Sequence, residues 1–263
     1  MRGTCDGLVI REMPYGESDR LITLLTADEG KILVTAKGAR SLRSKNQSLC
    51  SLFTYANYEF YEKNGRRWLA GGSVREGFYG LPTNMTGFAL ACYVAQLAGE
   101  ITGEGVPAEG VLRMTLNILY AIEKGLKPYG QIKSAYEIFS AREAGFSPDI
   151  SACGDCHTPF DKDGWLDVMN GRLICSECMS KRGQGAPIPE TDRFMTNNIL
   201  FPIDASGVEA WRYVSDAPPK KVLSFSLGDG ESAKRLSRAT EAYVVNHLER
   251  SFEALEFYNT VKE

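Results

Sequence analysis

The sequence predicts a multidomain α+β protein, in which a small N-terminal β-barrel precedes an α-helical domain that a metal-binding hairpin interrupts. Three observations support this prediction. Short alternating segments separated by turn signals fill the first 80 residues, apolar residues at helical spacing fill residues 81–150, and two Cys-x-x-Cys pairs follow. We therefore expect three parts: a barrel over 1–80, a helical domain over 81–150 and 183–263, and an inserted metal module over 151–182.

The N-terminal third predicts five strands joined by short turns. The strands are expected at residues 8–11, 20–26, 31–36, 53–61 and 66–74. Asp28-Glu29-Gly30 and Asn64-Gly65 are typical hairpin turns. Five strands in about 75 residues match the size of an OB-fold, a five-stranded Greek-key barrel, with an SH3-like barrel as the alternative.

Residues 81–150 predict three buried helices. Apolar side chains recur at helical spacing, and Gly103, Gly105 and Pro107, then Gly125 and Pro128, separate the segments. Near the C-terminus, one apolar stripe is expected from these residues: Leu236, Tyr243, Val244, Leu248, Phe252, Leu255 and Phe257. Residues 181–189 are rich in Gly, Ala and Pro and predict a linker.

Four cysteines predict one structural zinc ion. Cys153 and Cys156 form one pair, Cys175 and Cys178 form another, and 18 residues lie between the pairs. Residues 165–168 and 172–174 between them predict two strands, joined at Asn170-Gly171 by a type I′ turn in which both residues have positive φ. A haem-attachment motif at Cys156-His157 leaves the second pair unexplained, and two redox pairs have no need of a shared hairpin.

A basic segment after the third strand is the predicted nucleic-acid surface. Net charge is −3 overall, but residues 1–80 carry 12 Lys and Arg against 9 Asp and Glu. Lys37, Arg40, Arg43 and Lys45 are separated by small residues, which suits a flexible loop along a sugar-phosphate backbone; a solvated surface loop is the alternative. Three further arginines extend this surface: Arg66, Arg67 and Arg75. Trp68 and Tyr58 either stack on bases or belong to the core.

The sequence predicts no catalytic centre. Its two histidines, His157 and His247, form no metalloprotease or deaminase pattern, and no phosphate-binding lysine loop is present. A closed shell of four cysteines leaves no position open to activate water. With no long apolar run, no signal-peptide core and three scattered single cysteines, we expect a cytoplasmic, nucleoid-associated protein.

Two motifs add a resemblance over essentially the whole chain. They are Tyr15-Gly16-Glu17-Ser18-Asp19-Arg20, continued by Leu24-Leu25-Thr26 and Gly30, and Ala36-Lys37-Gly38-Ala39-Arg40. In these motifs and in the order of its parts, the sequence resembles the RecO family of bacterial recombination mediators. The resemblance implies DNA repair and homologous recombination by the RecF pathway: binding of single- and double-stranded DNA, strand annealing, and RecA loading onto DNA coated with single-strand-binding protein (SSB).

The resemblance also implies partners and site residues. The partners are RecR, in many bacteria RecF, and the acidic C-terminal tail of SSB. Lys37, Arg40, Arg43 and Lys45 match the family's basic barrel loop, and the four cysteines match its zinc ligands. An acidic tail needs an apolar notch rimmed by cations, for which the helical part offers Arg113, Lys124, Lys127 and Lys133. Without the resemblance, an OB-fold and zinc-hairpin adaptor acting on RNA or on the transcription machinery remains the alternative.

Overall fold

The computed structural model describes residues 2–41, 43–160, 162–183, 199–227 and 230–262. The chain divides into two compact units, residues 1–126 with 252–263, and residues 127–251. This division groups the barrel with three helices, and the predicted domain boundaries stay a prediction. Of the predicted linker, residues 181–183 end a helix and the rest lies outside the described residues.

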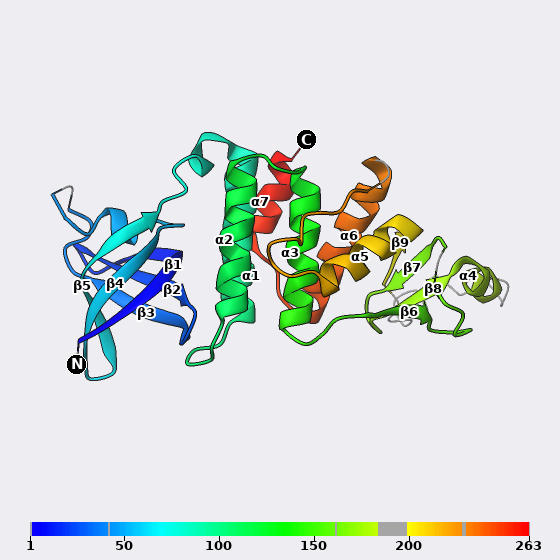
Figure 1. Ribbon diagram of the computed structural model, residues 1–263, viewed down its shortest axis with the longest axis horizontal. Coiled ribbons are helices and arrows are strands. Elements are labelled where there is room, and N and C mark those ends of the chain that lie inside the picture. The colour runs from blue at the N-terminus through cyan, green and yellow to red at the C-terminus, as the bar shows by residue number, and fades with distance from the viewer. Residues whose placement is uncertain (1, 42, 161, 184–198, 228–229, 263) are drawn as a thin grey trace. The chain divides into compact units, whose positions relative to one another are not determined.

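The first unit begins with a closed five-stranded barrel (Figure 1). The strands are β1 (Arg2–Tyr15), β2 (Asp19–Thr26), β3 (Gly30–Ala36), β4 (Tyr55–Lys63) and β5 (Arg66–Glu76). They close in the order β1-β2-β3-β5-β4, with β3 and β5 parallel and the other pairs antiparallel. This order confirms the predicted OB-type barrel.

Alternation of side chains fills the barrel. Val9, Leu24 and Val34 are fully buried in the cluster that fills the barrel, and next to Val34 the side chain of Leu33 is exposed. Tyr58 is also fully buried, and its hydroxyl donates to the carbonyl of Leu49 over 2.9 Å. Tyr58 therefore belongs to the core, which excludes it from base stacking.

Hairpin geometry in the barrel follows the predicted turn chemistry. Asn64 and Gly65 have φ of 54° and 70°, and they join Lys63 to its register partner Arg66. The fourth strand begins two residues later than expected, because Phe53 has φ of 66° and turns into the core. There its ring meets Phe88 of the following helix edge to face, at 5.9 Å between centroids.

The helices of the first unit are α1 (Met85–Ile101), α2 (Glu109–Glu123) and α7 (Glu253–Val261). Asn84 caps α1 by accepting from the backbone N–H of Gly87 over 2.8 Å. Helix α7 packs on α1, where Phe252 meets Tyr93 at 5.5 Å between ring centroids. The prediction of one continuous C-terminal stripe is therefore wrong, because its last residues return to the first unit while its first residues lie in the second.

The second unit combines helices with a four-stranded sheet. Its helices are α3 (Tyr129–Glu143), α4 (Ser176–Gly183), α5 (Ala205–Asp216) and α6 (Gly230–His247), and its strands are β6 (Asp149–Cys153), β7 (Gly164–Asp167), β8 (Arg172–Cys175) and β9 (Leu200–Ile203). The sheet order is β6-β8-β7-β9, so two strands flank the predicted hairpin. In the part of the chain with described coordinates, no helix is long and apolar enough to cross a bilayer.

The turn of this hairpin differs from the prediction. Of Asn170 and Gly171, only Gly171 has a positive φ, and four residues separate β7 from β8. The carboxylate of Asp167 accepts from the backbone N–H and the side-chain amide of Asn170, over 3.3 and 2.8 Å. The type I′ prediction is therefore wrong, because a local carboxylate organises a longer turn.

A buried ionic cluster joins α3 to α6. The Nζ atom of Lys133, fully buried, lies 3.0 Å from carboxylate oxygens of both Glu137 and Glu241 and donates to the carbonyl of Ser237 over 2.9 Å. The hydroxyl of Thr240 donates to the same oxygen of Glu137 over 2.6 Å. Burial raises the pKa of Glu137, and the ammonium of Lys133 opposes this rise.

Candidate functional site

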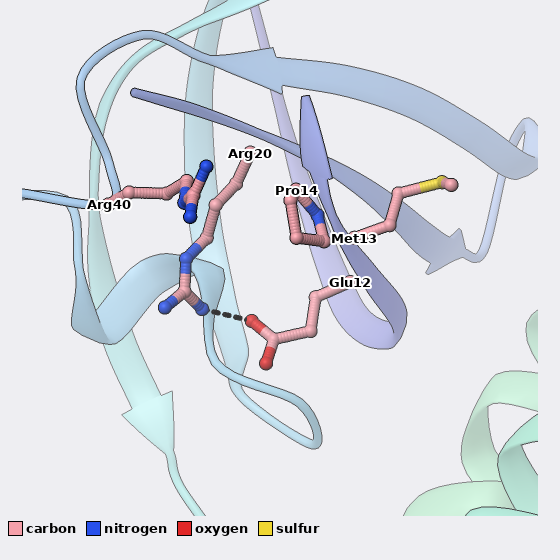
Figure 2. Close-up of a pocket in the computed structure, with 5 residues that line it drawn as sticks. All are labelled: Glu12, Met13, Pro14, Arg20 and Arg40. Atoms are coloured by element: carbon pink, nitrogen blue, oxygen red, sulfur yellow. Dashed lines mark hydrogen bonds and ion pairs between the residues drawn. The ribbon is translucent and has the colours of Figure 1, made fainter. Parts of the chain in front are cut away.

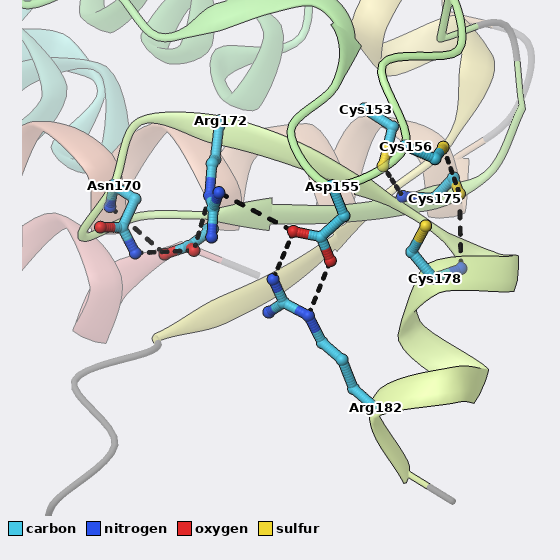
Figure 3. A network of polar contacts seen from close by, with 9 residues as sticks. Cys153, Asp155, Cys156, Asn170, Arg172, Cys175, Cys178 and Arg182 are labelled. Atoms are coloured by element: carbon cyan, nitrogen blue, oxygen red, sulfur yellow. Dashed lines mark hydrogen bonds and ion pairs between the residues drawn. The ribbon is translucent and has the colours of Figure 1, made fainter. Parts of the chain in front are cut away.

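Four cysteine side chains converge where two parallel strands end (Figure 3). Cys153 closes β6, Cys175 closes β8, Cys156 follows in a turn and Cys178 lies in α4. Their Sγ atoms all lie within 4.8 Å of one another. Four sulfur ligands at this separation fit a four-coordinate metal site, as the spacing predicts.

Backbone N–H groups donate hydrogen bonds to two of these sulfurs. The N–H of Cys175 donates to Sγ of Cys153 over 3.4 Å, and the N–H of Cys178 donates to Sγ of Cys175 over 3.5 Å. Burial works against ionisation of Cys153, but hydrogen bonds from backbone N–H groups outweigh it and lower its pKa to about 6. Hydrogen bonds with Cys175 and Cys156 raise the pKa of the Cys178 thiol.

Charged pairs brace the cluster from outside. Asp155, between the first two cysteines, receives two hydrogen bonds from the guanidinium of Arg182 in α4, over 2.8 and 2.7 Å. Arg172 on β8 pairs with Asp155 over 3.8 Å and with Asp167 over 3.4 Å. Figure 3 shows Arg172 beside Asp155. The network ties together the first cysteine pair, the hairpin and α4. Among the described residues the metal cluster comprises the four cysteines and does not include His157.

The predicted basic loop is anchored at its start. The N–H of Gly38 donates to the carboxylate of Asp19 over 2.8 Å, and the N–H of Arg40 donates to the carbonyl of Ser18 over 3.0 Å. The guanidinium of Arg40 also donates to the carbonyls of Gly16 and Glu17, over 3.3 and 3.0 Å. The two sequence motifs therefore contact each other, and Arg40 is a residue that holds the loop against the β1–β2 turn.

The other three cations of the loop project outward. Lys37, Arg43 and Lys45 are exposed, and within the described residues none of them has an ion pair. The segment turns through a bond from the N–H of Ser44 to the carbonyl of Ser41 over 2.9 Å. The loop thus presents three cations from a hydrogen-bonded base, and its flexibility stays a prediction.

A shallow pocket of about 200 Å³ lies beside this anchor (Figure 2). Its lining is Glu12, Met13, Pro14, Arg20 and Arg40. The guanidinium of Arg20 pairs with the carboxylate of Glu12, so this carboxylate offsets one of the two arginine charges that line the pocket. This pairing makes the pocket a weak anion site, and the exposed loop cations lie outside its lining.

The three further arginines of the prediction have different surroundings. Arg66 is exposed at the β4–β5 hairpin. Arg67 lies 2.5 Å from a carboxylate oxygen of Glu29 and over the ring of Phe60, and Arg75 lies 3.0 Å from Asp6. Carboxylates therefore already partner Arg67 and Arg75, which reduces the positive potential that either offers to phosphate.

An aromatic and basic outer face is the feature that sequence reasoning only half identified. The Nζ atom of Lys37 lies 4.5 Å from the ring centroid of Trp68, and Tyr61 stacks beside Trp68 with rings 15° from parallel. Lys63 and Arg66 lie on the same face, two residues from Tyr61 and Trp68 along their strands. The sequence signal for this face is strand alternation: Phe60 and Leu69 are buried, so Tyr61 and Lys63 point outward.

The four cations proposed for an acidic tail have different surroundings. Arg113 and Lys124 are exposed in the first unit, and each pairs with a glutamate, Arg113 with Glu109 over 2.7 Å and Lys124 with Glu123 over 2.9 Å. Lys127 belongs to the second unit and donates to the carbonyl of Phe225 over 3.3 Å. Lys133 is fully buried in its ionic cluster, so it does not line a surface.

This chain is similar to known proteins of one family. The family model described as Recombination protein O N terminal matches residues 1–78, and Recombination protein O C terminal matches residues 82–200. Similar proteins are described as DNA repair protein RecO. The one from Listeria welshimeri is 31% identical over 204 residues, covering 77% of this chain and 79% of the relative. That of Anaeromyxobacter dehalogenans is 29% identical (99% and 97% covered), and that of Acetivibrio thermocellus 24% (97% and 95%).

Proposed function

Since the chain belongs to the RecO family, we propose that it is a non-catalytic DNA-binding protein of DNA repair and homologous recombination. It binds single and double strands and anneals complementary strands. The observation that carries the proposal is the ordered base of the loop between β3 and β4, from which Lys37, Arg43 and Lys45 project. Cations without carboxylate partners bind phosphates more strongly than paired ones.

Annealing needs two polyanions to approach each other. A protein that neutralises phosphates on both strands lowers their repulsion and leaves the bases free to pair. The barrel residues supply this neutralisation, with Arg66 extending the loop's surface. Arg40 positions the loop, and Arg67 and Arg75 have smaller parts because Glu29 and Asp6 partner them.

The metal of the four-cysteine cluster is proposed to be zinc with a structural role. Four thiolates suit Zn²⁺ and leave no open coordination position. Bound zinc supplies a crosslink, and the chain itself supplies the N–H donors to sulfur and the Asp155–Arg182 brace. A hairpin of four-residue strands buries little surface of its own, so the crosslink contributes to its folding.

The proposed partners follow the family resemblance. They are RecR and the acidic tail of SSB, with RecF in some bacteria, and the outcome is loading of RecA onto SSB-coated DNA in the cytoplasm. For the tail, the candidate cations that remain are the exposed Arg113 on α2 and Lys124, which directly follows α2 and lies over the ring of Tyr120. Lys133 is dropped because it is buried, and Lys127 is half-buried in the other unit.

An annealing assay with SSB-coated complementary strands tests the function. The wild-type protein is expected to accelerate annealing, and the triple change Lys37→Glu, Arg43→Glu and Lys45→Glu to abolish it. The salt dependence of single-strand affinity should fall by about 2 in log–log slope, since each phosphate contact contributes about 0.7.

A matched control carries the same change in net charge elsewhere. Lys220, Lys221 and Lys234 are exposed in the second unit, and their reversal to Glu should leave annealing unchanged. Equal loss in both triple variants contradicts the loop assignment. Acceleration with RNA strands but not with DNA supports instead an adaptor that acts on RNA.

A further inference from the structure

We propose that Trp68 and Tyr61, on the outer face of the barrel, bind unpaired nucleobases by stacking and so favour single strands over duplex. The inference rests on the proposed DNA-binding function and deepens it by naming the form of DNA and the contacts. Stacking differs from phosphate neutralisation because only a base outside a duplex presents its ring face. The aromatic contact is therefore expected to favour single-stranded DNA, whereas the phosphate contacts are expected to bind single-stranded and double-stranded DNA alike.

Register in the barrel places the two rings together. Tyr61 and Trp68 are direct partners across β4 and β5, and their ring centroids lie 6.5 Å apart with the rings nearly parallel. On either side, Arg2 pairs with Tyr61 and Thr35 pairs with Trp68, so this row crosses four strands of the barrel. The side chain of Tyr61 is 38% exposed, whereas that of the preceding Phe60 is buried, so Tyr61 faces out of the barrel.

Cations surround the aromatic pair. Lys37 lies two residues beyond Thr35 and holds its ammonium 4.5 Å from the centre of the Trp68 ring. Lys63 and Arg66, direct register partners, flank the pair at the hairpin. Alternation puts Lys63 and Arg66 on the same face as Tyr61 and Trp68, and the contact with Trp68 puts Lys37 there. This arrangement is complementary to a nucleotide: the aromatic rings can stack on its base, and the surrounding cations can bind its phosphate.

The position of Lys37 suggests how the site is occupied. Its ammonium lies over a face of the Trp68 indole and is held by cation–π attraction. A base that stacks on this face takes the place of the ammonium, and the flexible lysine stem keeps the charge close to the adjoining phosphate. Trp68 thus contributes the base contact and Lys37 the phosphate contact at one nucleotide.

Affinity measurements with two DNA forms over a salt series test the proposal. Fluorescence anisotropy with labelled oligo-dT and with a duplex of equal length provides the readout. Trp68→Ala should weaken oligo-dT binding about tenfold at every salt concentration and change duplex binding less than about twofold. Tyr61→Ala should act in the same direction, and Trp68→Phe should retain most of the affinity. Lys37→Ala should instead weaken both forms and lower the salt slope by about 0.7 to 0.9.

A matched control is Tyr120→Ala. Tyr120 is an exposed tyrosine of α2 with Lys124 over its ring at 5.7 Å, and its removal should leave oligo-dT binding unchanged. Thermal unfolding checks that each variant is folded. If Trp68→Ala does not fold, Tyr61→Ala tests the stacking contact in its place. Folded Trp68→Ala and Tyr61→Ala that bind oligo-dT like wild type overturn the stacking contact alone. A wild-type protein that binds neither DNA form overturns the proposed function itself.

Discussion

The carboxylate of Asp19 accepts a hydrogen bond from the backbone N–H of Gly38 over 2.8 Å. It thereby joins the turn after β1 to the start of the basic loop, and Arg40 reinforces the same junction through the carbonyls of Gly16 and Glu17. Gly38 has φ of 62°, so the loop reverses there in a backbone conformation that glycine adopts without strain. Asp19 and Gly38, one in each motif, lie 19 positions apart in the chain and yet meet, because each motif supplies hydrogen-bond partners to the other.

Removal of this contact should loosen the loop and destabilise the barrel. Asp19→Ala leaves the N–H of Gly38 without its acceptor, and we expect a loss of about 1 kcal/mol in the free energy of unfolding. Asp19→Asn keeps an acceptor oxygen and should restore most of that loss. Urea denaturation of the three proteins measures it, and equal destabilisation by Asn and Ala shows that the hydrogen bond is not the cause.

The buried cluster on α3 and α6 should respond very differently to the loss of its cation and the loss of one anion. Lys133→Met removes the ammonium that pairs with Glu137 and Glu241, and we expect it to cost about 3–5 kcal/mol in the free energy of unfolding. Glu137→Gln leaves one cation facing one anion, so it should cost less than about 1.5 kcal/mol. Denaturation at neutral pH compares them, and similar costs contradict the charge argument.

The same glutamate should give stability a definite dependence on pH. Burial raises the pKa of Glu137 above its ordinary value of 4.5, so the folded state holds this proton where the unfolded state has lost it. The stability of wild type relative to Glu137→Gln is therefore greatest below pH 4.5 and falls as pH rises from there towards the raised pKa. A difference that instead grows with pH over this window means that the Lys133 ion pair, not burial, dominates.

Loss of the metal site is expected to lower the stability of the protein, and to weaken DNA binding only as a consequence. Cys175→Ser removes one of four ligands, and we expect loss of one equivalent of bound zinc with a lower melting temperature. Metal analysis and thermal unfolding measure these effects, and Ser176→Ala beside it is the matched control. A folded Cys175→Ser protein that has lost DNA binding contradicts the structural role and makes the metal module a functional centre.

The proposed recognition of an acidic tail is expected to depend on Arg113 of α2 and on Lys124, which directly follows α2. In a titration with an acidic peptide that ends in apolar residues, Arg113→Ala and Lys124→Ala should each weaken binding several-fold. Lys181→Ala, at the end of α4 in the other unit, is the control. Unchanged affinity in both the Arg113 and the Lys124 variant moves the tail site elsewhere.

Local features of the structure were readable from the sequence. The strand alternation, the Asn64-Gly65 hairpin and the cysteine spacing all depend on residues close together in the chain, and each appears as expected. The turn at Asn170 was misread because the side chain of Asp167 competes for the backbone there. Strand β9 was missed since four residues, Leu200–Ile203, carry too little periodicity to be recognised without the β7 partner that pairs with them.

By itself, then, the sequence determined the barrel, the four-cysteine cluster and the position of the basic loop, because periodicity and turn chemistry are local. Only the tertiary structure decided which cations are exposed and unpaired and which are engaged. Lys133 is buried between two carboxylates, Arg67 meets Glu29 from another hairpin, and Arg40 anchors a turn. It also brought Lys37 to Trp68, which lies 31 positions later in the chain. The sequence shows which residues are cations. Their interaction partners depend on strand register and helix packing, which bring together residues that are far apart in the chain.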